Sequence, residues 1–291
     1  MTIVTAAAQS EDVIAFAMVI DELAEDPQSG HAAIYVLEVD TVRLIDSLEY
    51  SVVSVAYSDA GPMTLGDWGK FKLYNGDTGT EETIPVKRGP LRGLGWIGGR
   101  AFSCGAAMQV WRRDAPESWT DISPPEDLRT EFDNHIFEAI DGFATDEVYV
   151  AGDFGVIWYW DGSAWDPIQC ASNACFYAIH CASDGYVYAA GQAGTVARGR
   201  RSDFEILYSD PDIIDLWSVD DFDGEIYFAG YTALFQLDFE NELTLIPEPL
   251  EFCRTYGVLS SAEGVLWSVG EKDVMIYDRD AWLRYMEVDV A

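Results

Sequence analysis

Carboxylates are the most abundant side chains in this sequence that could take part in chemistry. The chain of 291 residues contains 51 Asp and Glu, against 17 Lys and Arg and 3 His. Acid–base catalysis by carboxylates needs two particular groups held at a fixed separation, and no spacing singles out such a pair among so many. We therefore assign no catalytic residue.

The histidines and the short acidic motifs give no further catalytic or metal-binding signature. His31, His135 and His180 are far apart in the sequence, which argues against a histidine-based triad. Residues 220–224 (DDFDG) contain only part of a calcium-binding loop. Acidic residues before glycine recur in other turns, so we interpret this segment as a turn. Phosphate-binding loops, Gly-x-Ser-x-Gly elbows and His-Glu-x-x-His motifs are absent from the sequence.

One cluster has side chains typical of metal ligands, namely Cys170, Cys175, His180 and Cys181. Its spacings do not match the Cys-x-x-Cys pairs of zinc sites. The total of five cysteines is odd, unlike the even sets of secreted disulfide frameworks. We predict neither a metal nor another cofactor, and leave open whether these cysteines pair or bind metal.

The charge of the chain restricts its partners. The formal net charge is -34 and the pI is about 4.1. On a folded surface of roughly 12,000 Å², acidic groups would lie about 15 Å apart, which is about two Debye lengths at physiological salt. Such a surface disfavours nucleic acid and anionic membranes and attracts cationic proteins. Solubility alone is the alternative explanation. The basic cluster at residues 198–201 is interpreted as a solvated turn or a local ion-pair site.

The N-terminal segment carries no secretory signal. Apart from His31, the first basic side chain is Arg43, and the apolar run at residues 13–20 is too short to span a bilayer. We expect a cytoplasmic protein.

A strand-turn-strand pattern repeats about every 39 residues, and Gly152 and Gly191 mark its two clearest copies. Other copies in the same phase centre on Gly66, Gly105, Gly230 and Gly270. Residues 1–50 contain three apolar segments, 13–20, 32–38 and 42–45, separated by a turn at residues 26–30, and are interpreted as a degenerate unit. Units of about 42 residues have the length of a four-stranded propeller blade.

We therefore predict an all-β fold, a single β-propeller domain over residues 1–291. Seven four-stranded blades are expected, with six as the alternative. Residues 1–50 would form the first blade, and residues 51–291 the six clearer repeats. Ring closure is left open: residues 286–290 could form the last blade's own outer strand, while residues 2–5 could add to a sheet edge.

The best unit resembles a bacterial propeller pattern found in Kelch-like, sialidase-repeat-like and photosystem-assembly-factor-like blades. The residues that carry the resemblance are Val150-Ala-Gly-Asp-Phe-Gly-Val-Ile-Trp-Tyr-Trp-Asp-Gly-Ser-Ala-Trp165. The resemblance covers roughly residues 50–288 and implies architecture only. The sialidase Asp box and the Gly-His and Trp-Asp marks of WD40 blades are missing, so neither activity is implied.

Function is expected in the loops, because the glycines and turn acids of the repeat serve the architecture. Aromatic residues among acids suit a protein-binding surface. We predict partner-binding residues in the loops that follow the glycines marking each repeat, which we call the phase glycines, and in the loops that precede the innermost strands. About half of the aromatic side chains in these loops are expected to lie in the core. The predicted partner-binding residues are Asp67, Trp68, His135, Asp153, Phe154, Tyr177, Trp217, Tyr231, Tyr256 and Glu271.

The leading hypothesis is a non-enzymatic binding propeller, an immunity or inhibitor protein that neutralises a basic bacterial toxin as a monomer or in a 1:1 complex. An acidic surface can meet the cationic active site of such a toxin. A carbohydrate-binding or glycan-processing propeller is the second hypothesis, and a scaffold or assembly factor is the third.

Overall fold

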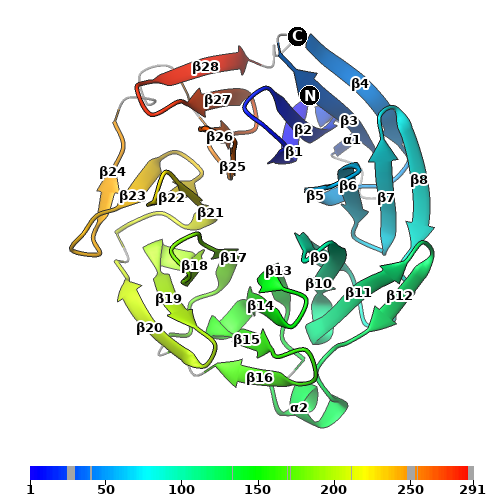
Figure 1. Cartoon of the computed structure of the whole chain (residues 1–291), viewed down its shortest axis with the longest axis vertical. Helices are drawn as coiled ribbons and strands as arrows, with labels where there is room; N and C mark the ends of the chain where they lie inside the picture. The colour runs from blue at the N-terminus through cyan, green and yellow to red at the C-terminus, as the bar shows by residue number, and fades with distance from the viewer. Residues whose placement is uncertain are drawn as a thin grey trace.

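The structure is a computed structural model, and it describes residues 1–24, 30–39, 41–132, 134–168, 170, 172–210, 212–247, 253 and 255–287. Seven antiparallel sheets of four strands each lie in chain order around a ring (Figure 1). The predicted all-β propeller of seven blades is confirmed, and the six-blade alternative is wrong.

Each blade is formed by four consecutive strands, and its first strand lies nearest the centre (Figure 1). Blade 1 contains β1 (Thr2–Ala8), β2 (Val13–Val19), β3 (Ala32–Glu38) and β4 (Thr41–Leu48). Blade 2 contains β5 (Val52–Ser58), β6 (Gly61–Gly66), β7 (Lys70–Asn75) and β8 (Thr78–Thr83). Blade 3 contains β9 (Leu91–Ile97), β10 (Arg100–Gly105), β11 (Gln109–Ala115) and β12 (Ser118–Asp121).

The remaining blades follow the same order. Blade 4 contains β13 (Phe137–Ala144), β14 (Glu147–Gly152), β15 (Ile157–Trp160) and β16 (Trp165–Ile168). Blade 5 contains β17 (Phe176–Cys181), β18 (Val187–Gly191), β19 (Val196–Arg200) and β20 (Asp203–Tyr208). Blade 6 contains β21 (Leu216–Phe222), β22 (Glu225–Gly230), β23 (Leu234–Leu237) and β24 (Leu243–Leu245). Blade 7 contains β25 (Val258–Ala262), β26 (Val265–Val269), β27 (Asp273–Tyr277) and β28 (Trp282–Glu287).

Two short helices interrupt this pattern, α1 (Asp21–Ala24) and α2 (Glu126–Glu131). Helix α2 lies in an insertion at residues 124–134, between blades 3 and 4, of which Asp133 is outside the described residues. Residues 26–29 of the predicted first turn are also outside them. No helix among the described residues is long and apolar enough to cross a membrane.

The hydrophobic core lies between the blades. In β15 of blade 4, Trp158 packs toward Phe102 of blade 3, beside Phe137 of its own blade. Ile157 of the same strand packs toward Val187 of blade 5. Both faces of this strand are therefore buried, which is why its sequence is a continuous apolar run. The same arrangement gives one apolar cluster between every two adjacent blades, including blades 7 and 1.

Blade 1 and blade 7 close the ring by side-by-side packing (Figure 1). Strand β1 is the innermost strand of blade 1, whereas the sequence had suggested only an added edge strand at residues 2–5. Strand β28 completes blade 7, as residues 286–290 had suggested, although residues 288–290 are outside the described part of the chain. Trp267 Nε1 of blade 7 donates a hydrogen bond to the Ser10 carbonyl of blade 1 at 3.1 Å. The described strands show no exchange between blades.

The phase glycines are required for space. Gly152 and Gly191 have extended backbones, with φ near 180°. A Cβ atom on Gly152 would lie 1.8 Å from the Ile136 carbonyl oxygen, and one on Gly191 would lie 1.9 Å from that of Cys175. In blades 4 and 5, the connection that enters the innermost strand thus passes directly over the glycine, and this close approach explains why glycine recurs at this position.

We expect Gly152→Ala to lower the free energy of unfolding by roughly 1–3 kcal/mol or more, since a backbone oxygen must move to admit the methyl group. Gly257→Ala is the matched control, because its Cβ would meet only the Val269 oxygen at 3.5 Å. Chemical denaturation of both variants measures the difference. Equal stabilities for the two would contradict the steric explanation.

Candidate functional site

The predicted site residues lie at one end of the ring, which we call the b–c face. It is formed by the turns between the second and third strands of each blade and by the connections that enter the innermost strands. Asp153 and Phe154 lie in the b–c turn of blade 4, a single 3-10 turn at Asp153–Gly155. Tyr177 and Trp217 are the second residues of β17 and β21, at the same end.

Phe154 has a conformation that its turn imposes and a side chain that the turn does not need. Its backbone φ is 54°, in the left-handed region that bulky residues rarely adopt. The equivalent residues of blades 3 and 5, Ala107 and Ala193, have φ values of 52° and 51°. Alanine therefore suffices for the turn, yet Phe154 places an aromatic ring that is 65% exposed on the surface.

A groove of about 660 Å³ lies beside this ring, between the α2 insertion and the b–c turn of blade 4. The Phe154 ring stacks on His135 with 4.9 Å between ring centroids. His135 Nδ1 lies 3.9 Å from an Asp153 oxygen, which also accepts a hydrogen bond from the Ile136 amide at 2.9 Å. Burial raises the pKa of Asp153. The structure thus brings His135, Asp153 and Phe154 together.

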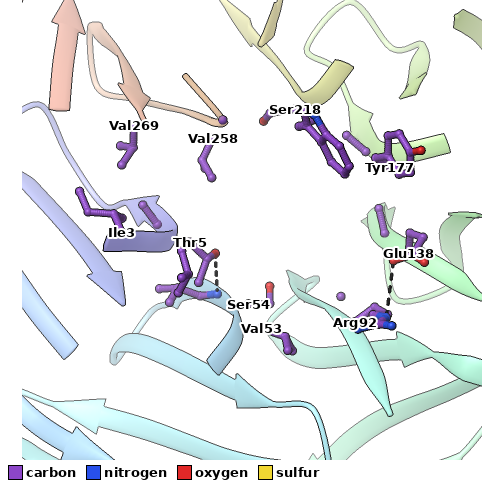
Figure 2. Close-up of a pocket in the computed structure, with 18 of the residues that line it drawn as sticks. Ile3, Thr5, Val53, Ser54, Arg92, Glu138, Tyr177, Ser218, Val258 and Val269 are labelled. Carbon is purple, nitrogen blue, oxygen red and sulfur yellow. Dashed lines mark hydrogen bonds and ion pairs between the residues drawn. The ribbon is translucent and has the colours of Figure 1, made fainter. Parts of the chain in front are cut away.

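A second cavity, of about 610 Å³, occupies the channel mouth. In Figure 2, Ile3, Val258 and Val269 lie on one side of it, and Tyr177 and Glu138 lie on the other. The wall from blades 1 and 7 is mostly apolar but includes Thr5 and Glu271, and the wall from blades 4 and 5 is aromatic and acidic.

Four other predicted residues line the channel mouth with Tyr177. Trp217 stacks on Tyr177 with ring centroids 4.2 Å apart and is 47% exposed. Tyr231 donates a hydrogen bond to Glu271 at 2.9 Å. Tyr256 is only 1% exposed and belongs to the core between blades 6 and 7, so it shapes the wall and offers little surface to a partner.

Asp67 and Trp68 lie apart from both cavities, in the b–c turn of blade 2. Trp68 is 62% exposed, and the Asp67 carbonyl accepts a hydrogen bond from the Leu91 amide. The predicted residues therefore form three groups on one face: the channel mouth, the groove beside α2 and the isolated turn of blade 2.

Most of the described Lys and Arg side chains form ion pairs with carboxylates on the sides of the blades. In the basic cluster at residues 198–201, Arg198 pairs with Glu205 at 2.9 Å, and Arg200 pairs with Glu147 of the neighbouring blade at 2.8 Å. The interpretation of this cluster as an ion-pair site is confirmed. Because cations are so few, many carboxylates keep their charge without a partner, and the surface field is negative.

Sequence reasoning missed a polar cluster inside the ring, centred on His180 of β17. His180 Nε2 lies 2.6 Å from an Asp221 oxygen and 3.6 Å from an Asp220 oxygen, both on β21. Its Nδ1 lies 3.5 Å from Asp141 on β13. Three blades meet at this imidazole, and no local sequence signal joins residues 40 positions apart.

The surroundings of His180 favour its charged form. Burial opposes protonation, but hydrogen bonds with Asp141 and Asp221 and the charge of Asp220 hold its pKa well above the ordinary value of 6.5. His180, Asp220 and Asp221 are also the one group of described residues with the spacing of metal ligands. The contacts are accounted for by a protonated imidazole among carboxylates, and a metal ion would have to displace its proton.

The cluster around His180 does not have the geometry of a catalytic triad. Asp221 contacts both His180 and the Ser183 hydroxyl, whereas a catalytic triad places the imidazole between the carboxylate and the hydroxyl. Among the described residues, the group with the spacing of metal ligands joins His180 to Asp220 and Asp221 and contains no cysteine. Burial and nearby carboxylates raise the pKa of Cys175 to about 12, so its thiol is unreactive at neutral pH.

Comparison with known proteins gives one relative by sequence. No family model matches the chain. The chain is 40% identical over 203 residues to the Immune protein Tsi7 of Pseudomonas aeruginosa, in a match that covers 68% of this chain and 64% of that protein. The chain thus spans a little under two thirds of this relative's length.

Solved structures with the same fold are far more distant in sequence. U3-55K matches with a TM-score of 0.68 and 14% identity, over 100% of this chain and 93% of its own. The RRP9 WD40 repeats match with a TM-score of 0.68 and 14% identity, over 100% and 92%. YCF48 bound to D1 peptide matches with a TM-score of 0.60 and 13% identity, over 80% of both chains. These likenesses show the propeller fold alone.

We expect His180→Ala to destabilise the protein by roughly 3 kcal/mol near pH 6, since it leaves three carboxylates without their cation. The contribution of His180 is complete below the unfolded-state pKa of about 6.5. Above that pH it falls by about 1.4 kcal/mol per unit until the raised folded-state pKa is passed.

Denaturation curves of wild type and variant between pH 6 and 9 test this prediction. Ser183→Ala is the control, because it removes a hydroxyl from the same cluster and no titrating group. A pH-independent difference between wild type and His180→Ala would contradict the prediction, because it would show that folding leaves the pKa of His180 unchanged.

Proposed function

We propose that this protein is a non-enzymatic immunity protein that binds and neutralises a basic bacterial protein toxin. The observation that carries the proposal is the 40% identity over 203 residues to a relative named as an immune protein. We also propose that it acts in the cytoplasm, as a monomer forming a 1:1 complex.

The b–c face is the surface we propose for the toxin. Protein interfaces depend on a few exposed aromatic anchors surrounded by polar residues. Trp68, Phe154, Trp217 and Tyr231 are each between 46% and 65% exposed on this face. Phe154 supports the proposal most directly, because its turn does not require an aromatic side chain.

The charge of the chain supports a cationic partner. A net charge of -34 would accelerate encounter with a basic protein and would repel competing anionic surfaces. The aromatic anchors would then supply the buried area that holds the complex together. Acidic surroundings and aromatic anchors thus have separate roles, one in the rate of association and one in the lifetime of the complex.

Co-expression tests the proposed function. The open reading frame adjacent to the gene for this chain would be expressed alone and together with it. We expect growth arrest by the neighbour alone, rescue by this chain, and co-purification of the two proteins at 1:1. A toxic neighbour that this chain neither binds nor neutralises would count against the proposal.

Alanine variants test the proposed face. We expect Phe154→Ala and Trp217→Ala each to weaken binding of that toxin by about 30-fold, corresponding to roughly 2 kcal/mol for an interface anchor. Phe239→Ala is the matched control, because Phe239 is 93% exposed but follows the third strand of blade 6, at the opposite end of the ring. Calorimetry or surface plasmon resonance gives the dissociation constants. Loss of affinity in the control alone would move the interface to the other face.

A further inference from the structure

We propose that the channel mouth binds an arginine side chain at the tip of a partner loop, with the guanidinium against Trp217 and Glu138. This inference rests on the proposed function and assigns the chemistry that the toxin must present.

The aromatic part of the site is a prearranged platform. Tyr177 of blade 5 and Trp217 of blade 6 stack with an interplanar angle of 16°. The Tyr177 ring lies against one face of the Trp217 indole, and Trp217 remains 47% exposed. A planar guanidinium stacks well on an indole ring, where the ring quadrupole attracts the cation.

The acidic part of the site has more negative charge than its own cation can balance. Arg92 is the cation that faces Glu138, and its Nε lies 3.7 Å from a Glu138 oxygen, too far for a hydrogen bond. Burial raises the pKa of Glu138, the charge of Arg92 lowers it in part, and the charge of Asp153 raises it, so the net shift is upward despite Arg92. Burial also raises the pKa of Tyr177, as do the nearby carboxylates of Asp215 and Glu138. A second cation at this wall would relieve that excess charge.

The opposite wall specifies what accompanies the arginine. Ile3, Val258 and Val269 face the cavity across from Glu138 and Tyr177 (Figure 2). Val4 in the same wall is 42% exposed. An occupant that matches both walls carries a basic side chain next to an apolar one. The cavity of about 610 Å³ accommodates the tip of a loop, since pockets of this size hold one drug-sized group.

The test uses N-acetyl-arginine amide as the probe and N-acetyl-citrulline amide as its neutral match, with the backbone amide signal of Tyr177 followed by NMR. We expect saturable shifts with the arginine probe and at least fivefold weaker binding of the citrulline probe. Glu138→Gln and Trp217→Ala should each weaken the arginine probe at least fivefold. Phe239→Ala should leave it unchanged.

A further conservative variant separates loss of the arginine site from misfolding. Asp215→Asn retains an oxygen that can accept the hydrogen bond from the Ala193 amide and should also weaken the arginine probe. Equal binding of the two probes, or unchanged binding in the variants, would overturn the proposal. So would a shift of the Tyr177 signal by chitotriose without one by the arginine probe, because that would identify a sugar site.

The outcomes separate this inference from the proposed function. If the arginine probe binds but no toxin partner exists, the arginine site is supported and the proposed immunity function is contradicted. If the Glu138→Gln and Asp215→Asn variants still neutralise the toxin and bind it with unchanged affinity, the proposed function is supported and the arginine site is overturned.

Discussion

Every blade of this protein has two apolar faces, and neither can be covered within the blade itself. Trp158 and Ile157 of one strand are buried toward opposite neighbours, so the blade is stable only between two others. Seven clusters of buried residues, one at each junction, result from this constraint. Closure between blades 7 and 1 is therefore part of the core, because an open ring would expose two apolar sheets to water.

The same constraint explains the polar residues inside the ring. An innermost strand has no strand partner on its channel side, so its amide groups need other acceptors. The Cys181 amide donates to Asp141 of the preceding blade, and the Ser261 amide donates to Asp220 of its preceding blade. Carboxylates there satisfy the backbone, and His180 offsets their charge. Polar groups in this part of the channel are explained by their hydrogen bonds with the backbone. Glu138 at the channel mouth differs, because no backbone contact offsets the cost of its burial.

Local signals in the sequence predicted the fold well. Strands and turns were predictable because Gly152 and Gly191 each mark a close approach of the backbone to the connection that enters the innermost strand. The innermost strand of blade 1 was harder, since the first unit lacks a phase glycine, and its place depends on contacts with Trp267 at the far end of the chain. His180 was grouped with nearby cysteines on sequence grounds, whereas its carboxylate partners come from two other blades. The exposure of Tyr256 and Trp217 also depends on neighbouring blades, so sequence alone ranked them equally.

A repeated scaffold also shows which residues are free to change. Ala107, Phe154 and Ala193 share one strained backbone conformation, so the cost of the turn is the same whichever side chain it carries. Substitution at this position alters the surface without altering the fold, and blades 3 and 5 already show the side chain that architecture alone requires. A partner that changes can therefore be followed by changes at these turns and at the rim of the channel, while the junctions between blades stay fixed. The residues that hold the ring together and the residues proposed to bind a partner are therefore different members of the same repeat.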